Sequence, residues 1–178
     1  MSDDEARGPL AEFTALRAET DRRGTLQQGI FVLQLTAAGA IFSFALSDPS
    51  RVRFLLILPL TSYALCARYC LHHWGIERIG TYVRESLSAR VPGGLQWETW
   101  IQQYPARMRL IGWVDPFYLT FPGASALALA WTAPHTFTAR GGLSLLGRIW
   151  FSGLWGLGAI ATMLSIFMIW RITVRHRH

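Results

Sequence analysis

The side chains best suited to chemistry are one carboxylate and one guanidinium within long apolar stretches of the sequence. Asp115 is the only acidic residue in these stretches, and Arg68 is the only arginine. A charge in hydrocarbon costs about 2.5–3.5 kcal/mol on insertion scales, so such residues usually face the protein interior and pair. Together they could form an ion or proton site. Alternatively, the pair has a structural role: it holds two helices together, and the Arg68 side chain extends toward the membrane–water interface.

The expected depths of the two charges agree with a pair. Arg68 lies five residues before the end of its apolar stretch, and Asp115 lies four residues after the start of its own. If the stretches are membrane-spanning helices that rise about 1.5 Å per residue, both side chains lie roughly 6–8 Å below the same membrane–water interface. Gln34 lies somewhat deeper on the same side. The sequence therefore predicts an intramembrane polar pair, Arg68 with Asp115, close to Gln34, and at this depth a structural role is favoured.

Cys66, Cys70 and His73 have the types and spacing of metal ligands. They stand at positions i, i+4 and i+7 of one predicted helix face, next to His72, and thiolates and imidazoles bind zinc or copper. However, one helix face rarely supplies a closed site, and no further cysteine or acidic cluster completes this one. Cysteine also packs as a small apolar residue. We therefore expect apolar packing here, without a metal or a cofactor.

Sequence motifs for catalysis are absent. No phosphate loop, nucleophile motif or Ser/His/Asp arrangement occurs, and Gly93-Gly94 and Gly141-Gly142 are turn glycines with no Lys-Ser/Thr after them. An enzyme that acts on lipid would have to rely on Asp115, His72 and His73, the residues with catalytic chemistry near the bilayer. The sequence thus favours a protein that is not an enzyme.

Four long apolar runs must position these side chains. Each has 20 residues or more, and about 20 helical residues cross the roughly 30 Å hydrocarbon core. A cleaved signal peptide is disfavoured for the first run, because 26 residues of mixed charge precede it. We predict an all-α polytopic membrane protein, a single membrane domain over residues 1–178, whose first partner is the lipid bilayer. Its four transmembrane helices are expected at residues 27–46, 54–73, 111–132 and 149–170.

The basic residues set the expected orientation. All 17 are Arg, and 12 of them lie before the first run, between the second and third, or after the fourth; four lie in the other connections. This bias places both termini in the cytoplasm. Because the Arg residues cluster at the ends of the runs, we expect no nucleic-acid partner despite the net charge of +6. Arg without Lys indicates a GC-rich bacterial genome, hence the inner (plasma) membrane.

Three segments are expected on the cytoplasmic side: residues 1–26, 74–110 and the basic tail 171–178. Apolar residues from Ile76 to Leu87 recur at spacings of three and four. They predict an amphipathic helix, either an extension of the second span or a bent piece lying on the membrane. With the short helix that follows, it would form a cytoplasmic hairpin between spans two and three.

That short helix carries an aromatic stripe at helical spacing. We interpret the stripe as an interfacial face or a lid on the bundle, and the alternative is a face that binds a partner protein. Its members are Trp97, Trp100, Ile101 and Tyr104.

The third and fourth runs contain features that predict how they pack. Asp115-Pro116 and Pro122-Gly123 predict a bent or broken third span. Small residues on the fourth run let helix backbones approach closely, against another span or against a second copy of the protein. They are Ser152, Gly156, Gly158, Thr162 and Ser165.

The region from Glu12 to Ile101 resembles small, uncharacterised integral membrane proteins of bacteria, of the actinobacterial type. The resemblance implies a multi-span helical membrane protein and supplies no catalytic residues. It rests on Ala15-Leu16-Arg17-Ala18-Glu19, Leu58-Pro59-Leu60, Ile79-Gly80-Thr81-Tyr82-Val83-Arg84 and Trp97-Glu98-Thr99-Trp100.

The preferred hypothesis for function is a self-associating interaction or scaffold module, which works as a homo-oligomer or with a membrane partner protein. The first alternative is an oligomeric pore or ion channel, such as a defence or stress effector that permeabilises the membrane. A lipid-modifying membrane enzyme is a disfavoured third.

Overall fold

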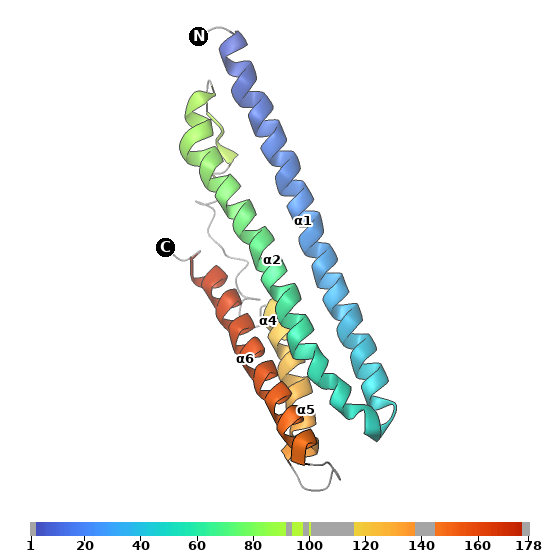
Figure 1. Cartoon of the computed structure of the whole chain (residues 1–178). Helices are drawn as coiled ribbons and strands as arrows, with labels where there is room; N and C mark the ends of the chain where they lie inside the picture. Colours follow the sequence, from blue (N-terminus) through green and yellow to red (C-terminus); the bar gives the residue numbers. More distant parts are fainter. Residues whose placement is uncertain (1–2, 92–93, 98–99, 101–115, 138–144, 176–178) are drawn as a thin grey trace. The chain divides into compact units, whose positions relative to one another are not determined.

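A computed structural model of the chain describes residues 3–91, 94–97, 100, 116–137 and 145–175. These residues are helical apart from short turns, and none of them belongs to a strand (Figure 1). Within them, three stretches are long and apolar enough to cross a membrane: Arg7–Leu46, Pro49–Arg90 and Leu145–Ile172. The prediction of an all-helical protein with membrane-length helices is confirmed.

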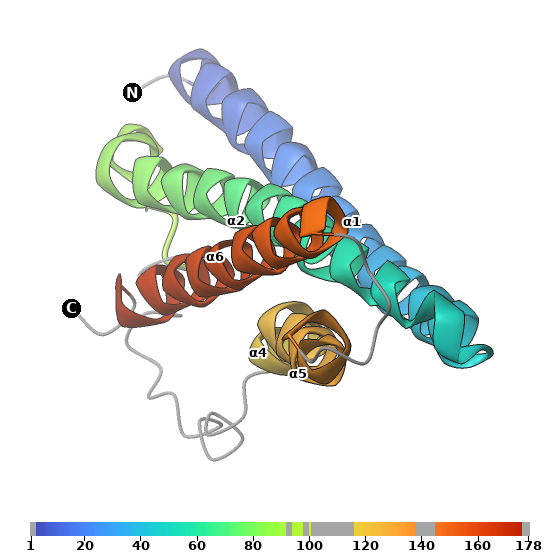
Figure 2. The same cartoon turned by 60° about the horizontal axis from the view of Figure 1, so that its bottom comes forward.

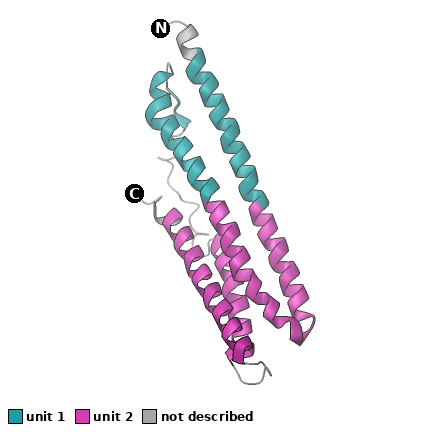
Figure 3. Cartoon of the chain, in the orientation of Figure 1, with its two compact units in different colours: residues 1–29, 71–113 teal, residues 30–70, 114–178 magenta. Residues whose placement is uncertain are grey.

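The chain divides into two compact units, which Figure 3 shows in separate colours. Unit 1 comprises Met1–Gly29 and Leu71–Trp113, and unit 2 comprises Ile30–Cys70 and Val114–His178. The boundary passes through both α1 (Asp3–Leu46) and α2 (Ile57–Tyr82). Each unit therefore contains its own contacts between these two helices.

In unit 1, α1 extends well beyond the first apolar run. The helix ends at Leu46 as expected, but it begins at Asp3, so the segment before the run is helical and continuous with it. These additional turns are rich in Ala, Glu and Arg, which favour helix. Ion pairs between neighbouring turns support them: Glu19 accepts from Arg22 at 2.9 Å and from Arg23 at 2.6 Å.

A contact in unit 1 between α1 and the end of α2 fixes the two helices to each other. Tyr82 Oη donates a hydrogen bond to Glu12 Oε1 at 2.6 Å, and Arg90 Nη1 donates to Glu12 Oε2 at 3.3 Å. The carboxylate of Glu12 thus binds two side chains, Tyr82 at the end of α2 and Arg90 eight residues further along the chain.

The segment after the second apolar run is a continuation of α2. The helix passes through Tyr82 without a break and is followed by the π-helical turn η2 (Val83–Leu87) and the 3-10 turn η3 (Ser88–Arg90). Gly94 then adopts a φ of 69°, in the left-handed region that favours glycine, and its amide donates to the Val91 carbonyl at 2.9 Å. Most of the expected second helix of the hairpin lies outside the described residues, so the hairpin stays a prediction.

The connection between α1 and α2, in unit 2, is shorter than expected. Asp48 caps the 3-10 helix η1 (Pro49–Leu56), since its Oδ1 accepts the Ser50 amide at 2.8 Å. This backbone hydrogen bond holds the pKa of Asp48 below its ordinary value. Pro49 suits the first helical turn. Helical structure therefore resumes at Pro49, ahead of the second apolar run.

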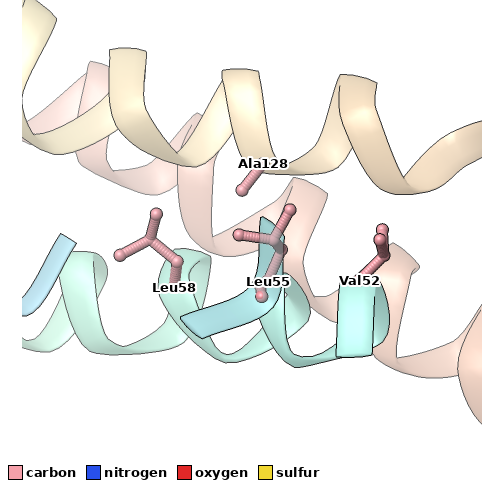
Figure 4. Close-up of a cluster of buried hydrophobic side chains, with 5 residues drawn as sticks. Val52, Leu55, Leu58 and Ala128 are labelled. Carbon is pink, nitrogen blue, oxygen red and sulfur yellow. The ribbon is translucent and has the colours of Figure 1, made fainter. Parts of the chain in front are cut away.

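A cluster of buried aliphatic side chains joins η1 and α2 to α5 (Ala124–Phe137). Val52, Leu55 and Leu58 lie close to Ala128 of α5, and all four are buried (Figure 4). Ala45 of α1 belongs to the same cluster. In lipid, helices gain little from exclusion of water, so we attribute the stabilisation here to close van der Waals packing.

The segments α4 (Pro116–Tyr118), η5 (Leu119–Gly123) and α5 follow one another without a break and form one helical column. Figure 2 shows α4 and α5 nearly end-on. η5 is a π-helical turn in which the Ala124 amide donates to the Leu119 carbonyl, five residues back. Pro122 has no amide hydrogen, and its ring would clash with the carbonyl four residues earlier in a regular helix. At Pro122-Gly123 the expected distortion of the third span is thus a wide turn, and the column then continues to Phe137.

The last helix, α6 (Leu145–Arg175), packs against α5 in unit 2. Trp155 Nε1 donates to the Leu129 carbonyl at 3.0 Å, and the rings of Trp155 and Phe137 meet edge to face at 5.3 Å between centroids. The predicted fourth span, residues 149–170, lies wholly inside this helix.

Candidate functional site

A buried polar contact around Gln34 joins three helical segments within unit 2. Gln34, from α1, is fully buried. Its Nε2 donates to Ser62 Oγ of α2 at 2.7 Å and to the Thr120 carbonyl of η5 at 3.1 Å. Because a backbone carbonyl can only accept, the contact with Thr120 fixes which end of the amide is the nitrogen.

The π-helical turn explains why the Thr120 carbonyl receives this bond. In a regular α-helix the amide of Ala124 would donate to it. Here the Ala124 amide donates instead to the carbonyls of Leu119 and Phe121. The side chain of Gln34 thus binds a backbone group that the wide turn has released, as the freed backbone of a membrane helix requires.

The other end of the Gln34 amide is an acceptor without a partner among the described residues. Its Oε1 is buried and receives no hydrogen bond from them. A carbonyl oxygen in such surroundings can accept a hydrogen bond from water or from a protonated group. The arrangement therefore supplies one donor end, which is used to hold helices together, and one available acceptor.

Most other buried hydroxyls of unit 2 bond within their own helices. Ser125, Thr132, Thr162 and Ser165 each donate to the carbonyl four residues earlier, at 2.8–3.0 Å. Their protons are therefore not available to neighbouring helices. Two polar side chains that do link separate helices in the described part of this unit are the amide of Gln34 and the indole of Trp155.

The structure places Arg68 on an exposed position of α2, whereas Ser62, Cys66 and Cys70 of the same helix are buried. Arg68 makes no hydrogen bond with Gln34. Asp115 lies outside the described residues, so the Arg68–Asp115 pair stays a prediction. The part of the expected site that the structure describes is Gln34 and its two partners.

Cys66 and Cys70 are free, buried thiols that pack with Phe121 and Ile169. His73 belongs to unit 1, where its Nε2 lies 3.8 Å from Glu77 Oε1. In the described ranges no three His, Cys, Asp or Glu side chains come close enough to hold a metal ion. The two thiols thus have the surroundings of small apolar residues.

The aromatic stripe is described in part. Trp97 and Trp100 are 53% and 49% exposed, and their rings stack with centroids 5.4 Å apart. Ile101 and Tyr104 lie outside the described residues. The interfacial face and the partner-binding face both stay predictions for this stripe.

The small residues of α6 divide between two faces. Gly158, Thr162 and Ser165 are buried, and a Cβ at position 158 would lie 3.1 Å from Leu129 Cδ2 and 3.2 Å from Pro59 Cβ. Gly156 differs, because a Cβ there would meet no described atom within 4 Å. One set of small residues therefore packs inside unit 2, and Gly156 does not.

Sequence reasoning missed the Thr120 carbonyl and the bonding of Gln34 to Ser62. Pro122-Gly123 was a usable signal for the first, since a proline inside a helix releases carbonyl groups that need new donors. Nothing in the spacing of Gln34 and Ser62 along the chain indicates that they meet.

Comparisons with known proteins add no assignment to this geometry. No protein family matches the chain, and neither a curated protein nor a solved structure matches it. The resemblance to small actinobacterial membrane proteins therefore stays a prediction.

Proposed function

We propose that this protein is a non-enzymatic integral membrane protein of the bacterial inner membrane that works by associating with a second copy of itself. It has four spans, with both termini in the cytoplasm. The excess of Arg at one set of helix ends supports this orientation. The unbroken helical column from Pro116 to Phe137 supports the third span.

The observation that carries the proposal is a strip of α6 where two glycines, which lack side chains, stand between large exposed ones; we call this strip the hollow. A Cβ on Gly153 or on Gly156 would meet no described atom within 4 Å. Large apolar side chains border these glycines: Ile149 is 64% exposed, Ile160 57% and Met163 69%. In lipid, small residues flanked in this way allow another helix to approach closely.

A second copy fits this hollow because it brings the same face. In a two-fold pair each α6 would place its own glycines against those of its partner, so one surface serves both sides of the interface. Ser152, which stands four residues before Gly156, adds a further small residue at the edge of this face. The proposed interface is therefore formed by α6 against α6.

Replacement of Gly156 by Leu is expected to abolish association by filling the hollow. The measurement is energy transfer between donor-labelled and acceptor-labelled full-length protein in liposomes, diluted with lipid to separate specific pairs from crowding. We expect at least a tenfold weaker association, which corresponds to about 1.4 kcal/mol. Gly39→Leu, at an exposed and equally open position of α1, is the matched control and should leave energy transfer unchanged.

Equal energy transfer in the wild type and in Gly156→Leu would contradict the proposal, and so would an equal loss in Gly39→Leu. The same liposomes permit a test of ion flux. A leak of ions from them would favour the oligomeric pore in place of the interaction module.

A further inference from the structure

Unit 1 contains a half-open cleft of about 450 Å³ between α1 and the second half of α2, which we call the cavity. Two of its lining side chains are guanidinium groups, one from each helix, and the rest are apolar or aromatic apart from one glycine. The lining residues are Arg23, Leu71, Trp74, Gly75, Arg78 and Ile79.

Gly75 allows Arg23 to lie across the surface of α2. A Cβ at position 75 would overlap Arg23 Nη1 and would come within 2.7 Å of its Cζ. Arg23 Nε donates to Glu19 Oε1 at 2.6 Å, which fixes the plane of the guanidinium. The geometry of the cavity thus depends on a glycine and on an ion pair that orients the Arg side chain.

The charge around the cavity is only partly balanced. Glu19 binds both Arg22 and Arg23, so one negative charge offsets two positive ones. Arg78 is exposed and makes no hydrogen bond or ion pair with a described residue. The nearest acidic residue along its helix, Glu77, faces His73. The cavity therefore retains donors for an anion.

The place of the cavity along the helices indicates which anion it suits. Arg23 precedes the first apolar run by four residues, and Arg78 follows the second by five. Leu71, within that second run, is 55% exposed. Guanidinium groups thus stand at the level where an apolar run ends, beside an exposed apolar side chain. Phosphate groups and acyl chains of a bilayer meet at the same level.

We propose that this cavity binds the phosphodiester headgroup of an anionic phospholipid, with Arg23 and Arg78 as donors and an acyl chain along Leu71. Arg forms paired hydrogen bonds with phosphate oxygens. Trp74 supplies an indole of the kind that is enriched at this depth. The inference rests on the proposed membrane-spanning role of α1 and α2, and it does not depend on self-association.

The test is retention of lipid by the full-length protein in mixed micelles, counted by native mass spectrometry. Phosphatidylglycerol is the anionic probe, and phosphatidylcholine is the zwitterionic one. Each basic group near a lipid surface contributes about fivefold in affinity. We therefore expect Arg23→Gln and Arg78→Gln each to weaken binding of phosphatidylglycerol about fivefold, and the double variant about 25-fold.

Arg22→Gln is the matched control, because it removes the same charge from the same turn of α1 without altering the lining of the cavity. It should weaken retention of phosphatidylglycerol less than Arg23→Gln or Arg78→Gln does. Arg78→Gln keeps the test valid if Arg23→Gln fails to fold, since Arg78 is exposed. The Gly156→Leu variant should still bind phosphatidylglycerol, so a loss of self-association can be distinguished from a loss of lipid binding.

Three results would overturn the inference. The first is equal retention of phosphatidylglycerol and phosphatidylcholine by the wild type. The second is a loss in Arg22→Gln as large as that in Arg78→Gln, which would indicate attraction by general charge. The third is displacement of the lipid by millimolar inorganic phosphate, which would assign the cavity to a soluble anion.

Discussion

Gly158→Leu is expected to destabilise unit 2 more than any other single change considered for α6. The first carbon of a new side chain would already lie 3.1 Å from Leu129 Cδ2 and 3.2 Å from Pro59 Cβ. The proline ring is rigid, so it cannot give way as a flexible side chain would. Overpacking typically costs about 1–3 kcal/mol, and the additional atoms of Leu place this variant at the upper end. The measurement is the midpoint of unfolding in a detergent titration.

Gly153→Leu provides the comparison in dilute detergent, where the protein is monomeric, since it introduces the same side chain on the same helix at an open position. We expect its stability to lie within about 0.5 kcal/mol of the wild type, as is usual at exposed sites. If the two variants unfold at the same midpoint, α6 does not pack against Pro59 and Leu129 as described.

The second large effect is expected at Gln34. Replacement by Met removes the donor from Ser62 Oγ and from the Thr120 carbonyl, which leaves both groups short of a partner in a buried place. We expect a loss of about 1–2 kcal/mol in the free energy of unfolding. The same change removes Oε1, a buried acceptor with no described partner, and this partly offsets the loss.

A double-mutant cycle of Gln34→Met with Ser62→Ala separates these contributions. Hydrogen bonds between membrane helices have coupling energies of about 0.6 kcal/mol on average and up to about 1.7, and the short distance of 2.7 Å favours a value toward the upper end. Gln28→Met, at an exposed position of α1, should be neutral and uncoupled to Ser62→Ala. Additive effects of Gln34→Met and Ser62→Ala would show that the contact does not contribute to stability.

The membrane-length helices could be predicted from the sequence because an apolar run of about 20 residues is typical of a helix that crosses a membrane. Where these helices begin could not be predicted as well. Hydropathy locates the apolar part, whereas α1 continues to Asp3 through turns held by side-chain pairs such as Glu19 with Arg23. Similarly, Asp48 and Pro49 start η1 ahead of the second run through local capping.

Of the candidate site, only Gln34 could be predicted from the sequence, and its hydrogen-bond partners could not. A glutamine in an apolar run signals a buried polar contact, and Gln34 is indeed buried. Its partners depend on the turn at Pro122-Gly123, whose sequence predicts a distortion but not a π-helical one. Which carbonyl is released, and which helix faces it, follows from packing between distant segments.

For the small residues of α6, the sequence predicted close contacts but not their partners. Their spacing predicts close helix contacts, and for Gly158, Thr162 and Ser165 the contact is inside unit 2. The sequence could not separate these residues from Gly156, because composition does not identify the helix that covers each face. That separation is the basis for the proposed interface between two copies.

Cysteine cross-linking along α6 in native membranes tests the proposed self-association most directly. Gly156→Cys lies in the hollow, whereas Leu157→Cys, where the native side chain is 57% exposed, points about 100° further around the helix. Cys66 and Cys70 are buried, so the wild type should not cross-link under mild oxidation. We predict a covalent dimer with Gly156→Cys and none with Leu157→Cys. Equal cross-linking at both positions, or none at either, would contradict an interface formed by this face of α6.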